Sequence, residues 1–171
     1  MIPAEIKKTE NIAEYIVHMY QTEDLILSYN FKLDDIFAYV IKHMTKDEAE
    51  LKELLLWYAS VIEQMQNENV VETKKRLSST QNIVSELSAL HQQLLKSNKD
   101  YQQLFNEAES DINQQIELSG KAISDPVQIC LNGVYGMMLI QLNGKKVNSA
   151  QQAMLQKFGN LLALLSKQYQ Q

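Results

Sequence analysis

The chain has few of the residues that interrupt helices. Its 171 residues include only 5 glycines and 2 prolines, so strong turn signals are rare. Leucine, glutamine, glutamate, lysine and alanine, which all favour helices, are abundant instead. We therefore predict an all-α fold, and the length is typical of a single domain over residues 1–171 with one core.

Cysteine and arginine are almost absent. The only cysteine, Cys130, lies in an apolar segment, which excludes an intrachain disulfide and favours a reduced, buried thiol in a cytoplasmic protein. Acidic residues outnumber basic ones by 21 to 16, and Arg76 is the sole arginine. The one short basic run, Lys74 to Arg76, resembles a solvated helix entrance more than a phosphate-binding face, so we expect no nucleic-acid partner.

The sequence also lacks a long hydrophobic run. Its first eleven residues are polar and contain no apolar core of a signal peptide. The most apolar stretch, residues 127–142, is interrupted by Gln128, Asn132 and Gln141. We expect this stretch to be a core helix, and we expect no membrane partner.

Motifs that perform known chemistry are missing as well. The chain contains no Glu-x-x-His pair, no His-Glu-x-x-His, no Cys-x-x-Cys, no glycine-rich phosphate loop and no serine nucleophile elbow. We therefore do not expect an enzyme, and we expect no cofactor or metal.

Apolar residues recur at three- and four-residue spacing along the whole chain, which is the pattern of amphipathic helices. The pattern predicts about seven helices, packed mostly antiparallel as a bundle. Residues 126–143 are apolar nearly all round and predict a central helix. Asp125-Pro126 indicates its start, Gly120 indicates the end of the preceding helix, and Thr45 with Glu48 predicts a capping box. The expected helical stripes cover residues 9–27, 33–44, 51–65, 80–95, 101–116, 126–143 and 154–165.

Three segments carry a family resemblance. They are Asn11 to Tyr15 continuing to Glu23–Ile26, then Leu90-His91 with Leu94–Ser97, and finally Cys130 to Gly136 with the tail from Leu161 to Tyr169. Together they resemble an uncharacterised bacterial family of compact helical proteins, which is catalogued only as a domain of unknown function. The resemblance covers almost the whole chain and implies the fold, but it implies no activity.

Two acidic residues interrupt the apolar face of the first predicted helix, residues 9–27. Glu23 lies at the centre of the apolar arc, within about 20° of Ile16, and Asp24 lies at its flank. One interpretation is that Glu23 turns toward solvent or binds backbone groups of the following turn. The other is a buried acid with a raised pKa, which is the kind of group that carries a proton or binds a ligand.

His91 interrupts a second apolar stripe, beside Leu87 and Leu90. It is either a core histidine hydrogen-bonded to a carbonyl or a tyrosine hydroxyl, or part of a site with Glu23. We expect Glu23 and His91 to lie within reach of each other, because each interrupts an apolar stripe and neither has another obvious ionic partner.

A thin polar strip marks the apolar stretch near residue 132. Gln128, Asn132 and Gly136 recur at four-residue spacing, with Gly133 beside them. Such glycines usually let a neighbouring helix approach closely while the amides mark an exposed edge. Alternatively, the strip lines a pocket in which Asn132 helps to orient a small ligand.

These observations favour a non-catalytic interaction or assembly module, with a protein partner and most simply a second copy of itself as a homodimer. The alternative is a small-molecule binding protein or a metal-assisted enzyme that uses Glu23, His91 and Asp24. The candidate ligand-binding residues are therefore Glu23, Asp24, His91 and Asn132.

Overall fold

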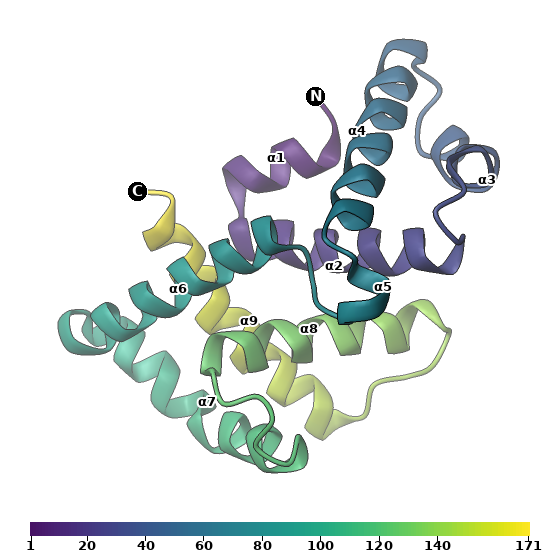
Figure 1. The fold of residues 1–171 in the computed structure, drawn as a ribbon. Coiled ribbons are helices and arrows are strands. Elements are labelled where there is room, and N and C mark those ends of the chain that lie inside the picture. The colour runs from purple at the N-terminus through teal and green to yellow at the C-terminus, as the bar shows by residue number, and fades with distance from the viewer.

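The computed structural model describes all 171 residues and contains α-helices, one short 3-10 helix and no strand (Figure 1). The predicted all-α fold is confirmed. No helix is both long enough and apolar enough to cross a bilayer. The elements are α1 (Pro3–Glu10), α2 (Ile12–Ser28), α3 (Leu33–Tyr39), η1 (Ile41–His43), α4 (Glu48–Asn67), α5 (Val70–Thr73), α6 (Ser78–Ser97), α7 (Lys99–Leu118), α8 (Pro126–Leu142) and α9 (Ser149–Tyr169).

The count of nine α-helices exceeds the seven expected, because two short helices were missed. Helix α1 begins with Pro3 in its first turn, where the missing N–H is harmless. It ends at Glu10, and the extended backbone of Asn11 breaks the predicted helix 9–27. The Asn11 side chain accepts a hydrogen bond from the Glu14 N–H and so starts α2. The other missed helix is α5, a single turn between α4 and α6.

The residues predicted to begin or end helices are confirmed at two positions and wrong at a third. Asp125 caps α8 by accepting from the Val127 N–H, and Gly120 adopts the left-handed conformation, with φ of 65°, as predicted. The capping box expected at Thr45 is wrong. Asp47 caps α4 instead, because its carboxylate accepts from the Ala49 N–H at 2.8 Å.

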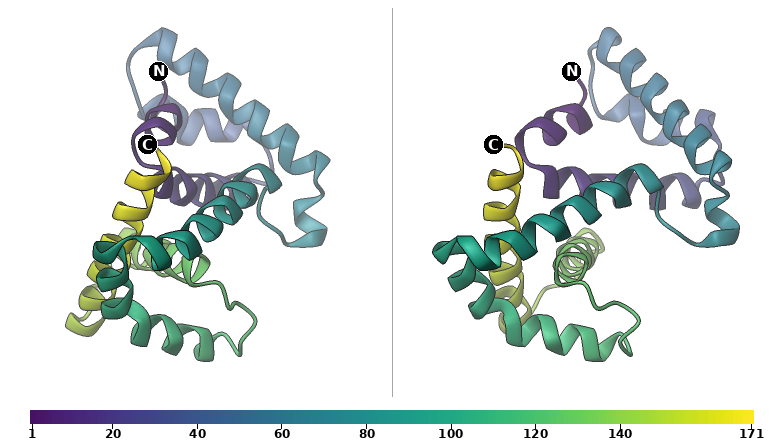
Figure 2. Two further views of the ribbon diagram at one scale, coloured as in Figure 1. Left: turned by 90° about the vertical axis from the view of Figure 1, so that its left-hand side faces the viewer. Right: turned by 60° about the vertical axis from the view of Figure 1, so that its left-hand side comes forward.

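Buried apolar side chains form two clusters where the sequence suggested one core. The first gathers side chains from α2, α6, α7, α8 and α9, and the second gathers them from α1, α2, α3, η1, α4 and α5. Helices α3 and α4 lie on one side of α2, while α7, α8 and α9 lie on the other (Figures 1 and 2). Helix α2 is therefore the element common to both clusters.

The arrangement follows from the unusually wide apolar surface of α2. Ile12, Ile16 and Tyr20 belong to the first cluster, whereas Met19 and Ile26 belong to the second. These positions cover two adjacent faces of one helix, so a single packing partner leaves part of the apolar surface exposed. Packing on both faces buries all five side chains.

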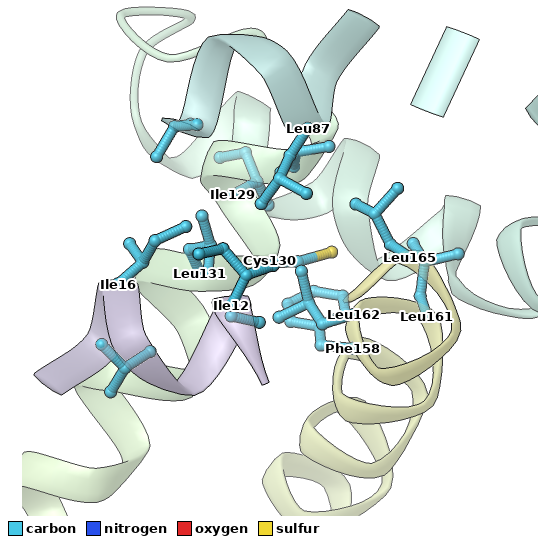
Figure 3. Close-up of a cluster of buried hydrophobic side chains, with 14 of the residues drawn as sticks. Ile12, Ile16, Leu87, Ile129, Cys130, Leu131, Phe158, Leu161, Leu162 and Leu165 are labelled. Atoms are coloured by element: carbon cyan, nitrogen blue, oxygen red, sulfur yellow. The ribbon is translucent and has the colours of Figure 1, made fainter. Parts of the chain in front are cut away.

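Helix α8 contributes Ile129, Cys130 and Leu131 to the first cluster, in contact with side chains of α2, α6 and α9 (Figure 3). Its C-terminal turns are less covered, because Leu139 and Leu142 are 36% and 63% exposed. The helix is thus buried along its first half and leaves apolar surface open near its end.

A close contact between α8 and α9 depends on Gly133. A Cβ atom placed there would lie 2.8 Å from the Phe158 ring, which is fully buried, whereas one at Gly136 meets nothing within 4 Å. We expect Gly133→Ala to lower the free energy of unfolding by about 1 to 3 kcal/mol through overpacking. Gly136→Ala is the matched control and should be neutral or stabilising by up to about 1 kcal/mol. Urea denaturation of both variants checks this, and equal stabilities would contradict the close contact.

Candidate functional site

Glu23 is a buried acid at the end of α2. Its side chain is 2% exposed, and its Oε1 accepts a hydrogen bond from the backbone N–H of Leu77 at 2.8 Å. Leu77 immediately precedes α6, so this bond fixes the start of that helix against α2. The second oxygen, Oε2, is buried and has no hydrogen-bond partner.

Loss of solvent raises the pKa of Glu23 from its usual 4.5 to about 7. The Leu77 N–H and the Arg76 guanidinium oppose this shift, whereas the nearby acids Asp24 and Glu68 add to it. Glu23 therefore changes charge near neutral pH, as expected for the buried-acid interpretation of the sequence.

Asp24 has a different environment one residue further along. The Arg76 guanidinium donates to both of its oxygens, from Nη1 to Oδ1 at 2.7 Å and from Nη2 to Oδ2 at 3.3 Å. The Tyr135 hydroxyl of α8 also donates to Oδ2, and Arg76 Nη1 further donates to the Tyr20 carbonyl. Burial, and then the hydrogen bond that its hydroxyl donates to Asp24, raise the pKa of Tyr135, so its phenol stays protonated.

Two aromatic rings surround the guanidinium of Arg76. Its Cζ lies 4.5 Å from the centroid of the Tyr20 ring and 5.6 Å from that of Tyr135. Cation–π attraction and the charge-assisted hydrogen bonds together hold this side chain in place. The prediction that the basic run is only a solvated helix entrance is thus wrong for Arg76, although Lys74 and Lys75 are exposed.

A chain of amide hydrogen bonds continues from Tyr20. Its hydroxyl donates to Gln81 Oε1 at 2.6 Å, and Gln81 donates to Gln128 Oε1 at 2.9 Å. Gln128 in turn donates to Asn132 Oδ1 at 2.9 Å. The first two amides of the predicted polar strip therefore connect α8 to α2 and α6.

His91 does not meet Glu23, so the expected pair is wrong. His91 lies 14 residues beyond Leu77 in α6, which places it about 21 Å along the helix axis from the backbone group that Glu23 binds. Its Nδ1 is 2.6 Å from the Tyr101 hydroxyl, and its ring packs edge-on against Phe105. Burial lowers the pKa of His91, which favours a neutral core histidine.

The titratable side chains offer no obvious metal centre. Nowhere do three or more His, Cys, Asp or Glu side chains gather so that they could hold a metal ion. The histidines are dispersed: His18 stacks on Trp57 at 5.8 Å, and His91 lies beside Tyr101.

Three hollows lie around these residues. A cavity of about 370 Å³ is walled by Glu23, Asp24 and the segment from Val70 to Arg76. A second, of about 380 Å³, is lined by Asn132, Gly133 and Gly136 together with side chains of α7 and α9. Gly136 thus borders open space, while Gly133 serves the close helix contact that the strip predicted. The role of Asn132 in orienting a ligand stays a prediction.

The third hollow is a groove of about 460 Å³ between α2, α8 and α9. Half of its 14 lining residues are hydrophobic, and its polar residues include Lys7, Glu14 and His18. Sequence reasoning missed this groove, because the three helices that form it are distant in the chain.

The raised pKa of Glu23 makes a testable prediction about stability. A carboxyl group whose pKa is higher in the folded than in the unfolded chain binds more protons when folded, so stability falls as pH rises from about 4.5 to about 7. Over this pH range we expect the free energy of unfolding of Glu23→Gln to fall by about 2 to 4 kcal/mol less than that of the wild type. Glutamine stays uncharged, and its side-chain oxygen still accepts from the Leu77 N–H.

Urea denaturation between pH 4.5 and 8 measures the decline. Glu68→Gln is the control, because Glu68 binds the Ser78 N–H at the same helix start but is not fully buried. Its decline should stay close to that of the wild type. An unchanged decline in Glu23→Gln would show that Glu23 is ionised throughout.

Comparison with known proteins agrees with the resemblance seen in the sequence. No curated protein and no protein of solved structure shows significant similarity to the chain. One family model, described as Domain of unknown function (DUF4924), matches residues 1–171. Because this match spans the whole chain, the protein belongs to the DUF4924 family.

Proposed function

We propose that this protein is a non-catalytic interaction module that forms a homodimer through the groove between α2, α8 and α9. The observation that carries the proposal is the half-apolar lining of that groove, which no segment of the chain covers. Leu142 follows Met138 of the groove by four residues and is 63% exposed, so it extends the apolar row by one turn. An exposed apolar surface bordered by polar residues is typical of a contact with another protein.

The use of the buried polar groups supports a non-catalytic role. The Asp24 carboxylate is neutralised by Arg76, and the His91 Nδ1 is bonded to Tyr101. A nucleophile or general base needs a free position facing a substrate. Asp24 is instead bonded to Arg76, and His91, whose Nε2 has no partner, is fully buried among helices. Their geometry stabilises helix packing.

The polar rim of the groove favours a second copy as the partner. It carries Lys7 and Glu14, which form an ion pair with each other at 3.2 Å. Two copies related by a two-fold axis present the same patch to each other, so the patch must be complementary to itself. A rim with one charge of each sign around an apolar centre meets that requirement, whereas a rim of one sign would repel its copy.

We also propose that this module lies in the cytoplasm. The buried, free thiol of Cys130 is compatible with such a reducing compartment. We treat residues 1–171 as one domain with α8 at its centre, because α2 joins both clusters and α8 packs against α2, α6, α7 and α9.

The dimer is tested by placing a charge at the end of the groove. We expect Leu142→Glu to weaken self-association by at least about tenfold, because a carboxylate would be buried against apolar side chains of the other copy. Light scattering coupled to size-exclusion chromatography, over micromolar concentrations, measures the mass. The wild type should have twice the mass of one chain, and the variant should approach the monomer.

Leu56→Glu is a matched control, because Leu56 on α4 is also 63% exposed but lies outside the groove. It should dimerise like the wild type. A wild-type protein that is monomeric throughout, or equal loss of dimer in both variants, would contradict the groove as the interface.

A further inference from the structure

The cavity at Glu23 is built from charges of both signs. Glu23 and Asp24 of α2 form one part of its wall, and Lys74, Lys75 and Arg76 form another. Met65, Val70 and Leu27 are among the apolar residues that complete it. With about 370 Å³ of space, the cavity accommodates a small molecule and not a polymer.

Glu23, which lines this cavity, has one carboxylate oxygen without a donor. Its Oε1 is bonded to Leu77, but Oε2 has no partner although the side chain is only 2% exposed. A buried carboxylate oxygen without a hydrogen bond costs free energy, because it has lost water and gained no donor. A ligand that donates to Oε2 would recover this free energy on binding.

The lysines supply the opposite charge. Arg76 is neutralised by Asp24, whereas Lys74 and Lys75 are exposed and form no ion pair. Lys74 also adopts a left-handed backbone, with φ of 53°, and so does Asn69, with φ of 57°, at the other end of α5. This conformation is uncommon for residues other than glycine, and it occurs on both sides of the single turn of α5, next to the lysines.

From these contacts we propose that the cavity binds a small zwitterionic molecule, with an ammonium group that donates to Glu23 and a carboxylate that lies against Lys74 and Lys75. A zwitterion supplies an ammonium group for the Glu23 oxygen that has no donor and a carboxylate for the two lysines that have no ion pair. A simple cation would face three basic residues, and a simple anion would leave the Glu23 oxygen without a donor. This site is separate from the proposed dimer groove, which shares none of its residues.

The test titrates the full chain with matched probes at about pH 8, where Glu23 is mostly ionised. The probes are the ω-amino acids from glycine to aminohexanoate, each beside its carboxylate-only and amine-only analogue, such as γ-aminobutyrate with butyrate and butylamine. Isothermal calorimetry or NMR shifts give the affinities. We expect at least one amino acid to bind about tenfold or more tightly than both of its analogues.

Three variants test which residues bind the ammonium group of the ligand and which bind its carboxylate. Glu23→Gln should weaken the preferred amino acid by about 10- to 100-fold, because a neutral amide replaces the carboxylate. Lys74→Gln with Lys75→Gln should weaken it by about tenfold or more. Lys99→Gln, at an exposed lysine on α7 that does not line the cavity, is the control and should bind like the wild type.

A second measurement does not depend on the variants. Near pH 7 an ammonium group beside Glu23 lowers its pKa, so binding should release protons, which calorimetry in two buffers of different ionisation heat detects. Proton uptake, equal binding of butyrate or of butylamine, an unaffected Glu23→Gln, or no binding by any probe at about 10 mM would each overturn the proposal.

Discussion

The ion pair between Asp24 and Arg76 is the interaction that the rest of the structure depends on most. It joins the end of α2 to the segment that leads into α6, and the Tyr135 hydroxyl brings α8 to the same carboxylate. Tyr20 and Tyr135 belong to the first apolar cluster, while Leu77, directly after Arg76, belongs to the second. The sole arginine of the chain thus lies where the two clusters meet. Lysine cannot replace it equally, because the planar fork of a guanidinium donates to both carboxylate oxygens while its charge lies near the two aromatic rings.

The same arrangement leaves Glu23 in an unfavourable position. One carboxylate oxygen accepts from the Leu77 N–H, and the other is buried without a partner. Arg76, whose positive charge acts on Glu23, is already bonded to Asp24. Local conflicts of this kind are expected where a protein retains a functional group against its own stability. The proposed ligand resolves this conflict, and the proposed dimer uses an earlier turn of α2, at Val17 and His18. One helix therefore serves both clusters and both proposed contacts.

Sequence periodicity predicted which faces are buried but not what they meet. The arc of α2 correctly placed Glu23 inside, because side-chain direction along a helix follows from spacing alone. Its partner was predicted wrongly as His91, because the neighbour of a helix depends on tertiary packing, and here it is the backbone of Leu77. Local cap chemistry was enough for Asp125 and Pro126. It failed at Asn11, where a polar residue inside an apparently continuous stripe starts a new helix.

Arg76 and Tyr135 were missed as site residues for the same reason. Arg76 directly follows two lysines, which suggests an exposed basic segment, and Tyr135 lies in an apolar helix. Neither pattern indicates a residue that binds Asp24. For Arg76 the available signal was rarity: a single arginine in a chain with 15 lysines is better placed at a bidentate contact than on the surface. Tyr135 is one of 8 tyrosines and had no such signal. The groove between α2, α8 and α9 had no signal at all, because it needs three helices to be placed in space.

A double-mutant cycle between Asp24 and Arg76 tests the central claim most directly. Asp24→Asn, Arg76→Gln and the double variant are compared with the wild type by urea denaturation at pH 7. The two side chains are 43% and 30% exposed, so solvent screening reduces their attraction, and we predict a coupling energy of about 1 to 2 kcal/mol. A coupling below about 0.3 kcal/mol, as for an ordinary surface pair, would contradict the claim that this pair joins the two clusters.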